Sequence, residues 1–524
     1  MQHKEWPLTS TWRYLIIITL LLGLFFRCFN IDRKVYWHDE VFTSLRISGY
    51  TVKDIKQQIF NGTILNREDL LKFHHPNLEK GLNESLNALA IDDPQHPPLY
   101  YIILRFWVYL FGGSVTAVRS LSVVISLLAF PGIYWLCWEL FEIPLIGWIA
   151  SIIIAISPFH ILYAQEAREY VLWTVTTLLS SAALLQAIRL NTKSSWGIYI
   201  LTVLTGLYTF MFTVLVAIGH GIYVILLENL RWTKTLASFL ISSLIIILGF
   251  LPWLLVFFNN YQQFSEGTNW TSLPVGFSFL LQMWAFNLIS IFIDFGVDLE
   301  DKWLFVISYI FLILVGYAIY LLCRQTPKRI WLFIVTLILT TALALILPDL
   351  ILGGQRSTVT RYLIPSLLGI ELALAYLLAF NITNISLAKR KFWQTITFLL
   401  VGIGIVSCSI ISQSEISWIK PVSYNIPAIA QIIKKSPQPL VISDSFLYNL
   451  GNIISLSYEL ENQTKFILVV PPNIPTIPNI PNTFSDIFLI NPIENFKNLI
   501  EEKNQIKTEL IFNDPYISVF QVKK

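Results

Sequence analysis

The feature that most constrains this chain is a series of long apolar runs between residues 12 and 412. A run of about 18 or more apolar residues is typical of a membrane-spanning helix, because only a helix satisfies its own backbone in lipid. Only 13% of the 524 residues are charged, whereas about 25% is usual for a soluble domain. We therefore predict an α-helical polytopic membrane domain over 1–412 with about eleven spans. The expected spans are 12–29, 117–138, 144–162, 169–190, 196–210, 211–228, 235–258, 303–322, 330–347, 361–380 and 393–412.

Basic residues orient these spans, since cytoplasmic loops are enriched in Lys and Arg. The first run ends in Phe-Arg-Cys-Phe-Asn without a small-residue cleavage site, which favours an uncleaved span over a signal peptide. An N-terminus in the cytoplasm places four basic clusters there: Arg189/Lys193, Arg231/Lys234, Arg324/Lys328/Arg329 and Lys389/Arg390/Lys391. The expected location is the plasma (inner) membrane, with outer loops at 30–116 and 259–302.

Two apolar stretches do not cross the membrane in this arrangement. The stretch 97–111 is too short and carries Arg105, so we predict a helix along the outer surface. The stretch 275–293 precedes the acidic run of Asp294, Asp298, Glu300 and Asp301. A crossing there would invert the charge bias, which favours a horizontal or re-entrant helix.

An odd number of spans leaves the C-terminus outside the cytoplasm, and residues 413–524 have a different composition. Short apolar β-type runs alternate there with two amphipathic segments, 428–435 and 493–503. We predict a small extracytoplasmic α/β domain over 413–524. Its expected strands are 440–443, 466–470, 486–490, 508–512 and 516–522, with a proline-rich loop at 471–481.

Asp39 and Glu40 follow the first span directly. Adjacent carboxylates at a membrane surface are costly to desolvate, which points to a function. Asp39 is the candidate general base for an acceptor hydroxyl, and Glu40 would support it or bind a cation. The alternative is an ordinary helix N-terminus, where acidic side chains complement the helix dipole.

The same outer loop ends in Asp-Asp-Pro-Gln-His-Pro-Pro-Leu-Tyr-Tyr at 92–101. The double proline imposes an extended entry into the surface helix. We expect His96 and Tyr100 to contact a phosphate or sugar there. A solvated histidine at a proline helix start is the alternative.

Two further polar segments fall on the outer face under this orientation. Between two spans lie Glu166, Arg168 and Tyr170, for which the functional interpretation is contact with a sugar hydroxyl and a phosphate. Arg356, Arg361 and Tyr362 precede a later span, where arginine is suited to a lipid phosphate. The alternatives are snorkelling caps and plain interfacial arginines.

The four segments together suit chemistry on a phosphate-linked substrate, with carboxylates as base and arginines neutralising the departing phosphate. The sequence leaves open whether a divalent cation takes part; Asp39, Glu40 and Glu166 offer oxygen ligands for one. Basic residues are scattered in short loops, which excludes nucleic acid as an expected partner.

These motifs resemble those of the GT-C glycosyltransferases, in particular the protein O-mannosyltransferase and lipid A aminoarabinose transferase group. The acidic pair Asp39-Glu40 is similar to the family's catalytic loop motif, and His-Pro-Pro-Leu at 96–99 to the corresponding mannosyltransferase motif. The stretch 157–170 resembles a second-loop motif of bacterial members, and Arg361-Tyr362 resembles their late-loop arginine. The resemblance covers about residues 10–380.

The resemblance implies a polyprenyl-phosphate monosaccharide donor, Asp39 as base, and a hydroxyl acceptor on an extracytoplasmic glycan, lipid or protein. A single displacement would invert the anomeric centre. The sequon-reading Trp-Trp-Asp motif of oligosaccharyltransferases is absent from the sequence, which argues against N-glycosylation. A lipid-linked sugar transporter or flippase, a glycan ligase or polymerase using a pyrophosphate carrier, and a non-catalytic scaffold remain alternatives.

Overall fold

In the computed structural model, residues 10–76, 79–296, 302–471, 473 and 484–523 are described. The chain folds into two compact units, each assembled from separate stretches of sequence. We call the first the membrane unit; it comprises Met1–Phe29, Asp93–Tyr100 and Ser120–Ser412. The second, called the mixed unit, comprises Asn30–Asp92, Tyr101–Arg119 and Gln413–Lys524.

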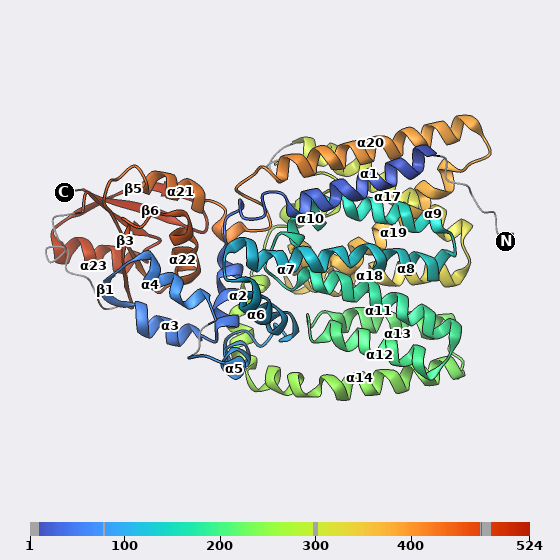
Figure 1. Cartoon of the computed structure of the whole chain (residues 1–524), viewed down its shortest axis with the longest axis horizontal. Coiled ribbons are helices and arrows are strands. Elements are labelled where there is room, and N and C mark those ends of the chain that lie inside the picture. The colour runs from blue at the N-terminus through green and yellow to red at the C-terminus, as the bar shows by residue number, and fades with distance from the viewer. Residues whose placement is uncertain (1–9, 77–78, 297–301, 472, 474–483, 524) are drawn as a thin grey trace. The chain divides into compact units, whose positions relative to one another are not determined.

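Among the residues that the structure describes, eight helical segments are long and apolar enough to cross a membrane, by length and composition. Several of these helices pack side by side in the membrane unit, as α18 and α19 do in Figure 1. The eight segments are α1 (Ser10–Cys28), α7 with α8 (Val115–Leu127, Ala129–Phe141), α11 (Tyr170–Leu190), α14 (Lys234–Asn259), α17 (Lys302–Gln325), α18 (Lys328–Leu352), α19 (Ile364–Ile382) and α20 (Leu387–Ile411). Each corresponds to one of the predicted spans, which confirms a helical multi-pass membrane protein.

The remaining three predicted spans are also helical, but each is shorter than a span. The segment 144–162 is broken into α9 (Pro144–Ala155) and α10 (Pro158–Ala164), which meet at 64°. The segment 196–228 forms α12 (Lys193–Leu207) and α13 (Thr213–Leu227), of 15 residues each. A helix of that length is about 22 Å long, less than the ~30 Å hydrocarbon core.

The break between α9 and α10 has a local cause and a distant compensation. Pro158 lacks the N–H that would bond the carbonyl of Ile154. Arg27 of α1 supplies the donors instead, bonding the carbonyls of Ile154 and Ala155 at 2.9 Å. A freed carbonyl in lipid must find a partner. The buried arginine therefore holds the bend that leads into residues 165–169.

The two stretches that were predicted not to cross are short or bent. Residues 99–111 form the 13-residue helix α6 (Leu99–Phe111). Residues 261–289 form α15 (Tyr261–Thr268), a 3₁₀ turn and α16 (Phe277–Ile289), with a 98° bend. Asp298, Glu300 and Asp301 lie outside the described residues. Whether the short helix lies on the surface and the bent pair is re-entrant stays a prediction, because a bent pair of this kind is either a broken span or a re-entrant segment.

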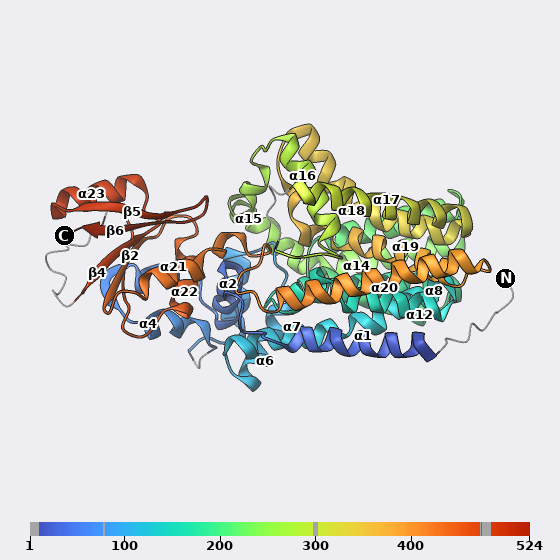
Figure 2. The ribbon, with the colours of Figure 1, turned by 90° about the horizontal axis from the view of Figure 1, so that it is seen from above.

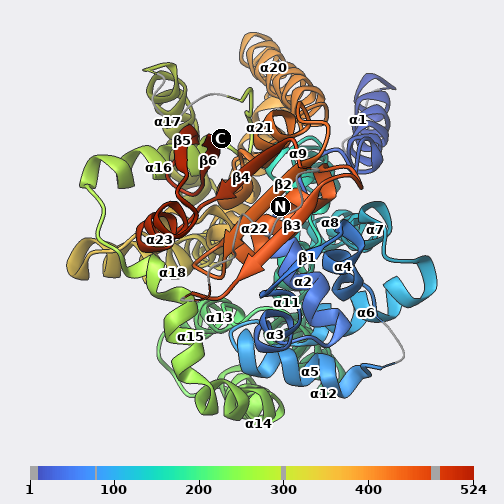
Figure 3. The same ribbon diagram turned by 90° about the vertical axis from the view of Figure 1, so that its left-hand side faces the viewer.

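The mixed unit contains a six-stranded sheet of order β1-β3-β2-β4-β6-β5. Its five C-terminal strands match the five predicted runs, with β3, β2 and β4 mutually parallel and β4, β6 and β5 antiparallel. They are β2 (Pro439–Asp444), β3 (Lys465–Val469), β4 (Asp486–Ile490), β5 (Lys507–Asn513) and β6 (Ser518–Lys523). In Figure 3 the strands of this sheet run diagonally across the view.

Alternate residues of the parallel strands enter two separate cores. Leu440 and Ile442 of β2 pack with Phe496 and Ile500 of α23 (Glu494–Asn504). Val441, between them, packs in the opposite core with residues of α21 (Ile426–Ile433) and α22 (Asn449–Glu459). Figure 2 shows α23 on one side of the sheet and α21 and α22 on the other.

The first outer loop completes this unit, so the unit is larger than the predicted domain at 413–524. Strand β1 (Asn61–Leu65) pairs antiparallel with β3. Two helices of the loop, α2 (His38–Ser48) and α3 (Val52–Ile59), bury side chains in the core that contains α21 and α22. β1 was not predicted because its Asn-Gly-Thr segment is exposed and lacks apolar alternation.

Candidate active site

The acidic pair lies at the amino end of α2, where Trp37 is an extended N-cap. Asp39 and Glu40 both occupy the first turn, where acidic side chains complement the helix dipole. Their surroundings differ, because Asp39 is half-buried and Glu40 is completely buried. The two adjacent carboxylates therefore lie in different environments.

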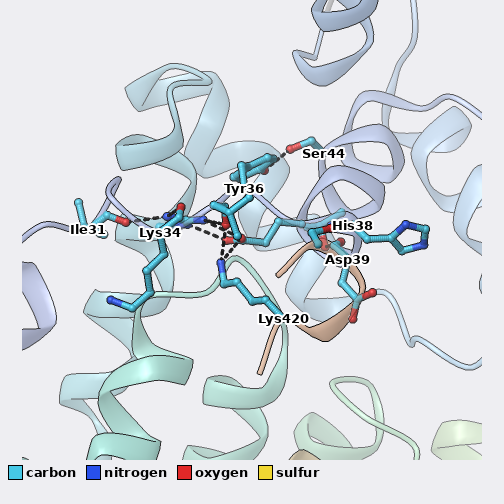
Figure 4. A network of polar contacts seen from close by, with 12 residues as sticks. Ile31, Lys34, Tyr36, His38, Asp39, Ser44 and Lys420 are labelled. Atoms are coloured by element: carbon cyan, nitrogen blue, oxygen red, sulfur yellow. Dashed lines mark hydrogen bonds and ion pairs between the residues drawn. The ribbon is translucent and has the colours of Figure 1, made fainter. Parts of the chain in front are cut away.

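Glu40 is held by two cations of the mixed unit, Arg119 and Lys420. Figure 4 shows Lys420 within this network of polar contacts. Arg119 binds both of its oxygens at 2.7 Å, in the bidentate geometry that gives the strongest pairing. Lys420 Nζ lies 2.6 Å from Glu40 Oε2 and also donates to the carbonyl of Val35. All three side chains are buried. Glu40 is thus an anchor for the start of α2.

Arg119 also binds the backbone that leads from α1 to α2. It donates to the carbonyls of Ile31, Lys34 and Val35 at 2.9 Å each. The adjacent Tyr36 hydroxyl lies 2.5 Å from Ser44 Oγ. These hydrogen bonds hold the backbone between α1 and α2 around the Arg119 guanidinium, and so determine the position of Asp39.

The electrostatics of the network favour an ionised Glu40. Burial alone would raise its pKa, but the charges and hydrogen bonds of Arg119 and Lys420 outweigh burial and lower the pKa to about 2. Burial and the nearby Tyr458 and Glu40 raise the pKa of Tyr36 well above 10.0, so its hydroxyl stays protonated. Neither group is suited to accept a proton near neutral pH.

A second polar cluster lies in the membrane unit, in the turn between α10 and α11. His96 Nδ1 lies 2.7 Å from Glu169 Oε1, and its Nε2 lies 3.2 Å from an Arg168 nitrogen. Arg168 also reaches Glu169 at 3.3 Å. Burial opposes ionisation of Glu169, but Arg168 and His96 hold its pKa at about 2. We call this the His96–Glu169 cluster.

Arg361 lies beside the same cluster. Its guanidinium carbon is 5.3 Å from the ring centre of Tyr170 and 5.7 Å from that of Tyr362. The Tyr170 hydroxyl accepts from Arg168 at 3.5 Å. Two arginines therefore meet around one tyrosine, which is an arrangement suited to a phosphate group.

Two other predicted site residues, Tyr100 and Arg356, lie elsewhere, and Glu166 lies in the turn that carries Arg168 and Glu169. Tyr100 is buried, and its hydroxyl lies 2.8 Å from Ser122 Oγ, as in a packing contact. Glu166 is fully buried near the cluster. Arg356 binds Asp349 at 3.0 Å and Ser272 at 2.6 Å, which braces the loop after α18.

Sequence reasoning did not single out four residues that build these sites. In the sequence, Arg119 and Lys420 look like ordinary charges near apolar segments. The acidic pair was the signal that could have prompted a search for a cationic partner. Glu169 lies one residue from Arg168, but its partner His96 is distant in sequence. Phe210 stacks on His96 and contacts Tyr170, with ring centres 6.4 and 5.6 Å apart.

Metal ligands do not gather in the part of the chain that the structure describes. No group of three or more His, Cys, Asp or Glu side chains is placed there to hold an ion. Of the candidate ligands, Asp39 and Glu40 belong to the mixed unit and Glu166 to the membrane unit.

Comparison with known proteins gives a family match over part of the chain. Residues 95–256 match the model of a family described as dolichyl-phosphate-mannose-protein mannosyltransferase. This segment includes His96, Arg168 and Glu169. No curated protein matches the sequence.

Solved structures of ArnT share the fold at low sequence identity. ArnT from Cupriavidus metallidurans in the apo state matches with a TM-score of 0.53 and 10% identity over 98% of each chain. The same protein bound to undecaprenyl phosphate matches with 0.50, 11% identity and the same coverage. An Archaeoglobus fulgidus oligosaccharyltransferase tethered with an acceptor peptide has a TM-score of 0.49 at 12% identity, over 98% of this chain and 74% of that chain.

These findings agree with the predicted resemblance. The chain has a GT-C fold and is a membrane glycosyltransferase that resembles mannosyltransferases and ArnT. The transporter and scaffold alternatives are set aside, because neither accounts for the family match.

Proposed function

We propose that this glycosyltransferase moves a monosaccharide from a polyprenyl-phosphate donor to a hydroxyl of an extracytoplasmic acceptor, with Asp39 as general base. The observation that carries the proposal is the division of labour in the acidic pair. Glu40 is buried and bonded to Arg119 and Lys420, whereas Asp39 beside it is partly exposed at the start of α2. One carboxylate anchors the turn and the other is presented for chemistry.

The reaction is a single displacement. Asp39 takes the proton of the acceptor hydroxyl, and that oxygen attacks the anomeric carbon. The bond from the anomeric carbon to the phosphate oxygen breaks, and polyprenyl phosphate leaves with the electron pair. One displacement inverts the configuration at the anomeric carbon.

The phosphate is assigned to the His96–Glu169 cluster and Arg361. Charge develops on the phosphate as it departs, and preorganised cations stabilise that charge. Glu169 orients Arg168 and His96, and Tyr170 and Tyr362 border Arg361. The ArnT structure bound to undecaprenyl phosphate supports a carrier of this class here.

The orientation follows the charge bias of the loops. We place the N-terminus in the cytoplasm, and Asp39 and residues 413–524 on the opposite face of the plasma (inner) membrane. Sugars held on polyprenyl phosphate are then used outside the cytoplasm.

The base assignment is tested with Asp39→Asn in purified protein, using polyprenyl-phosphate sugars as donors. We expect transfer to fall by about 10²- to 10⁴-fold with expression unchanged, as is typical for loss of a general base. Asp32→Asn is the matched control, since Asp32 is an exposed acid in the same connection. Wild-type rates for Asp39→Asn would exclude Asp39 as the base.

The donor assignment is tested with Arg361→Ala. We expect the donor KM to rise about tenfold or more, because a charge-assisted contact with phosphate is worth about 1.5–3 kcal/mol. Comparing monophosphate with pyrophosphate carriers in this assay separates a monosaccharide transferase from a glycan ligase. An unchanged donor KM would refute the phosphate role of Arg361.

A further inference from the structure

The amino end of α2 packs directly on the amino end of α22 within the mixed unit. The backbone N–H of His38 donates to Ser423 Oγ at 3.0 Å, and Ser423 bonds Asn452 of α22 at 2.8 Å. A Cβ at Gly451 would overlap the imidazole of His38, so only glycine permits this approach. The proposed base is therefore attached to the C-terminal part of the chain.

The loop that precedes α22 is Ser445–Tyr448, at the carboxyl end of β2. Leu447 has φ +41°, a backbone conformation that is costly for a branched side chain and is often found at functional sites. Buried Asp444 maintains it, accepting the N–H of Phe446 at 2.9 Å and the amide of Asn449 at 2.8 Å. The loop is strained and rigidly held.

The position of the loop in the sheet is typical of a binding site. In the sheet, β2 lies between β3 and β4. The chain places β3 on one side of β2 and then β4 on its other side, so the order of strands changes direction at β2. Open α/β sheets bind ligands in the crevice at the carboxyl ends of strands at such a switch point. Ser445–Tyr448 occupies this edge.

Aromatic side chains gather at this edge around His38 and Asp39. Tyr448 lies 5.5 Å from His38 and 6.2 Å from Tyr516 between ring centres. Phe446 and Leu447 are 46% and 67% exposed, and Tyr516 is 39% exposed. Burial, and after it the charge of Asp39, raise the pKa of Tyr448.

A groove of about 530 Å³ adjoins the loop. Its lining includes Lys53, Lys56, Phe60 and Val470, and Lys56 Nζ donates to the carbonyl of Ser445 at 3.2 Å. Asp92 also lines it, but its carboxylate is paired with Arg46 at 2.8 Å. The groove therefore has a net positive lining and the volume of a typical ligand site.

We propose that this edge is the acceptor site, and that the acceptor is a glycan carrying an anionic group. Tyr448 and Tyr516 stack on the apolar face of the accepting sugar beside Asp39. Lys53 and Lys56 bind a carboxylate or phosphate of the same glycan. Rings with polar hydroxyls suit a sugar, which has an apolar face and a polar rim. This inference rests on the proposed function, since it identifies the acceptor for Asp39.

Photo-crosslinking in native membranes tests the site with the full-length chain. A benzophenone amino acid replaces Leu447 in the Asp39→Asn background, and replaces Leu510 in a control; Leu510 is 50% exposed on β5. Mass spectrometry of the irradiated peptide should show a carbohydrate adduct containing a uronic acid or phosphate at position 447 and not at 510. Acyl-lipid adducts, equal adducts at both positions, or no adduct would overturn the acceptor site.

The anionic group is tested by Lys53→Gln in the same experiment. We expect the adduct yield at position 447 to fall about fivefold, with no change for Lys435→Gln, an exposed lysine of the same unit. An unchanged yield for Lys53→Gln would overturn the anionic character of the acceptor.

Failure of this inference is distinguishable from failure of the proposed function. Full transfer by Asp39→Asn with a glycan adduct at 447 rejects the base and keeps the acceptor site. Loss of transfer without such an adduct keeps the base and rejects the site.

Discussion

At the scale of single residues, neighbouring carboxylates acquire different roles from their partners. Glu40 faces a guanidinium and an ammonium that are both buried, and Asp39 one position earlier is partly exposed. Glu169 has the same kind of anchoring role between Arg168 and His96. In both sites a buried carboxylate orients groups assigned to the chemistry.

We predict that the main effect of Glu40→Gln is a loss of stability of the mixed unit, not a slower reaction by the folded enzyme. Removing one partner of a buried ion pair costs about 3–5 kcal/mol, because the remaining charges are left buried and uncompensated. Thermal unfolding of the detergent-solubilised variant should shift to a markedly lower temperature, whereas Asp39→Asn should leave it unchanged. Equal unfolding temperatures for the two variants would contradict the anchoring role.

The ion pairs of Glu40 also predict how acid affects the stability of the folded protein. The pKa of Glu40 is about 2 in the folded protein, below its ordinary value of 4.5. A lowered folded pKa contributes stability above the unfolded pKa, and that stability is lost as pH falls from about 4.5 towards 2. Unfolding temperatures of wild type and Glu40→Gln should therefore converge across this range.

At the scale of elements, the α9–α10 break depends on close packing of α1. A Cβ at Gly23 would lie 2.6 Å from the carbonyl oxygen of Ala155, the carbonyl that Arg27 binds. Only glycine allows α1 to approach closely enough for Arg27 to satisfy the freed carbonyls. Pro158, Arg27 and Gly23 therefore act together to hold the bend between α9 and α10.

We predict that Gly23→Ala weakens the membrane unit and lowers transfer by displacing α1 from α9. Gly402→Ala in α20 is the matched control, because nothing lies within 4 Å of the Cβ it would add. Thermal stability in detergent should fall by about 1–3 kcal/mol for Gly23→Ala, as for overpacking elsewhere. Equal stability of the two variants would show that the approach of α1 tolerates a methyl group.

At the scale of the whole molecule, the sequence is interleaved between its two units. The mixed unit takes Asn30–Asp92, Tyr101–Arg119 and Gln413–Lys524, so it draws on both ends of the chain. Segments at opposite ends of the chain meet as β1 on β3 and as Glu40 on Lys420. The proposed topology requires these segments to lie on one side of the bilayer.

We predict that cysteine labelling places them on the outer side. In a chain lacking the exposed Cys28 and Cys323, a cysteine at Leu510 should react with an impermeant maleimide in intact cells. A cysteine at Ile385, 97% exposed between α19 and α20, should react only after permeabilisation. The reverse pattern would reject the orientation and with it the extracytoplasmic chemistry.

The sequence alone determined the elements whose signals are local. Apolar length predicts the spans, and alternation predicts the five C-terminal strands, because burial of each run depends on its own residues. The motifs also identified His96, Arg168, Tyr170, Arg361 and Tyr362, which the structure places in one region of the membrane unit.

The tertiary structure decided what those residues contact. Arg119 lies 79 positions from Glu40 and Lys420 lies 380 positions away, so no local pattern pairs them. β1 forms against the edge that β3 offers, and the Tyr100 hydroxyl meets Ser122 Oγ of another helix. A side chain's role depends on its partners in space, and folding brings those partners from distant parts of the chain.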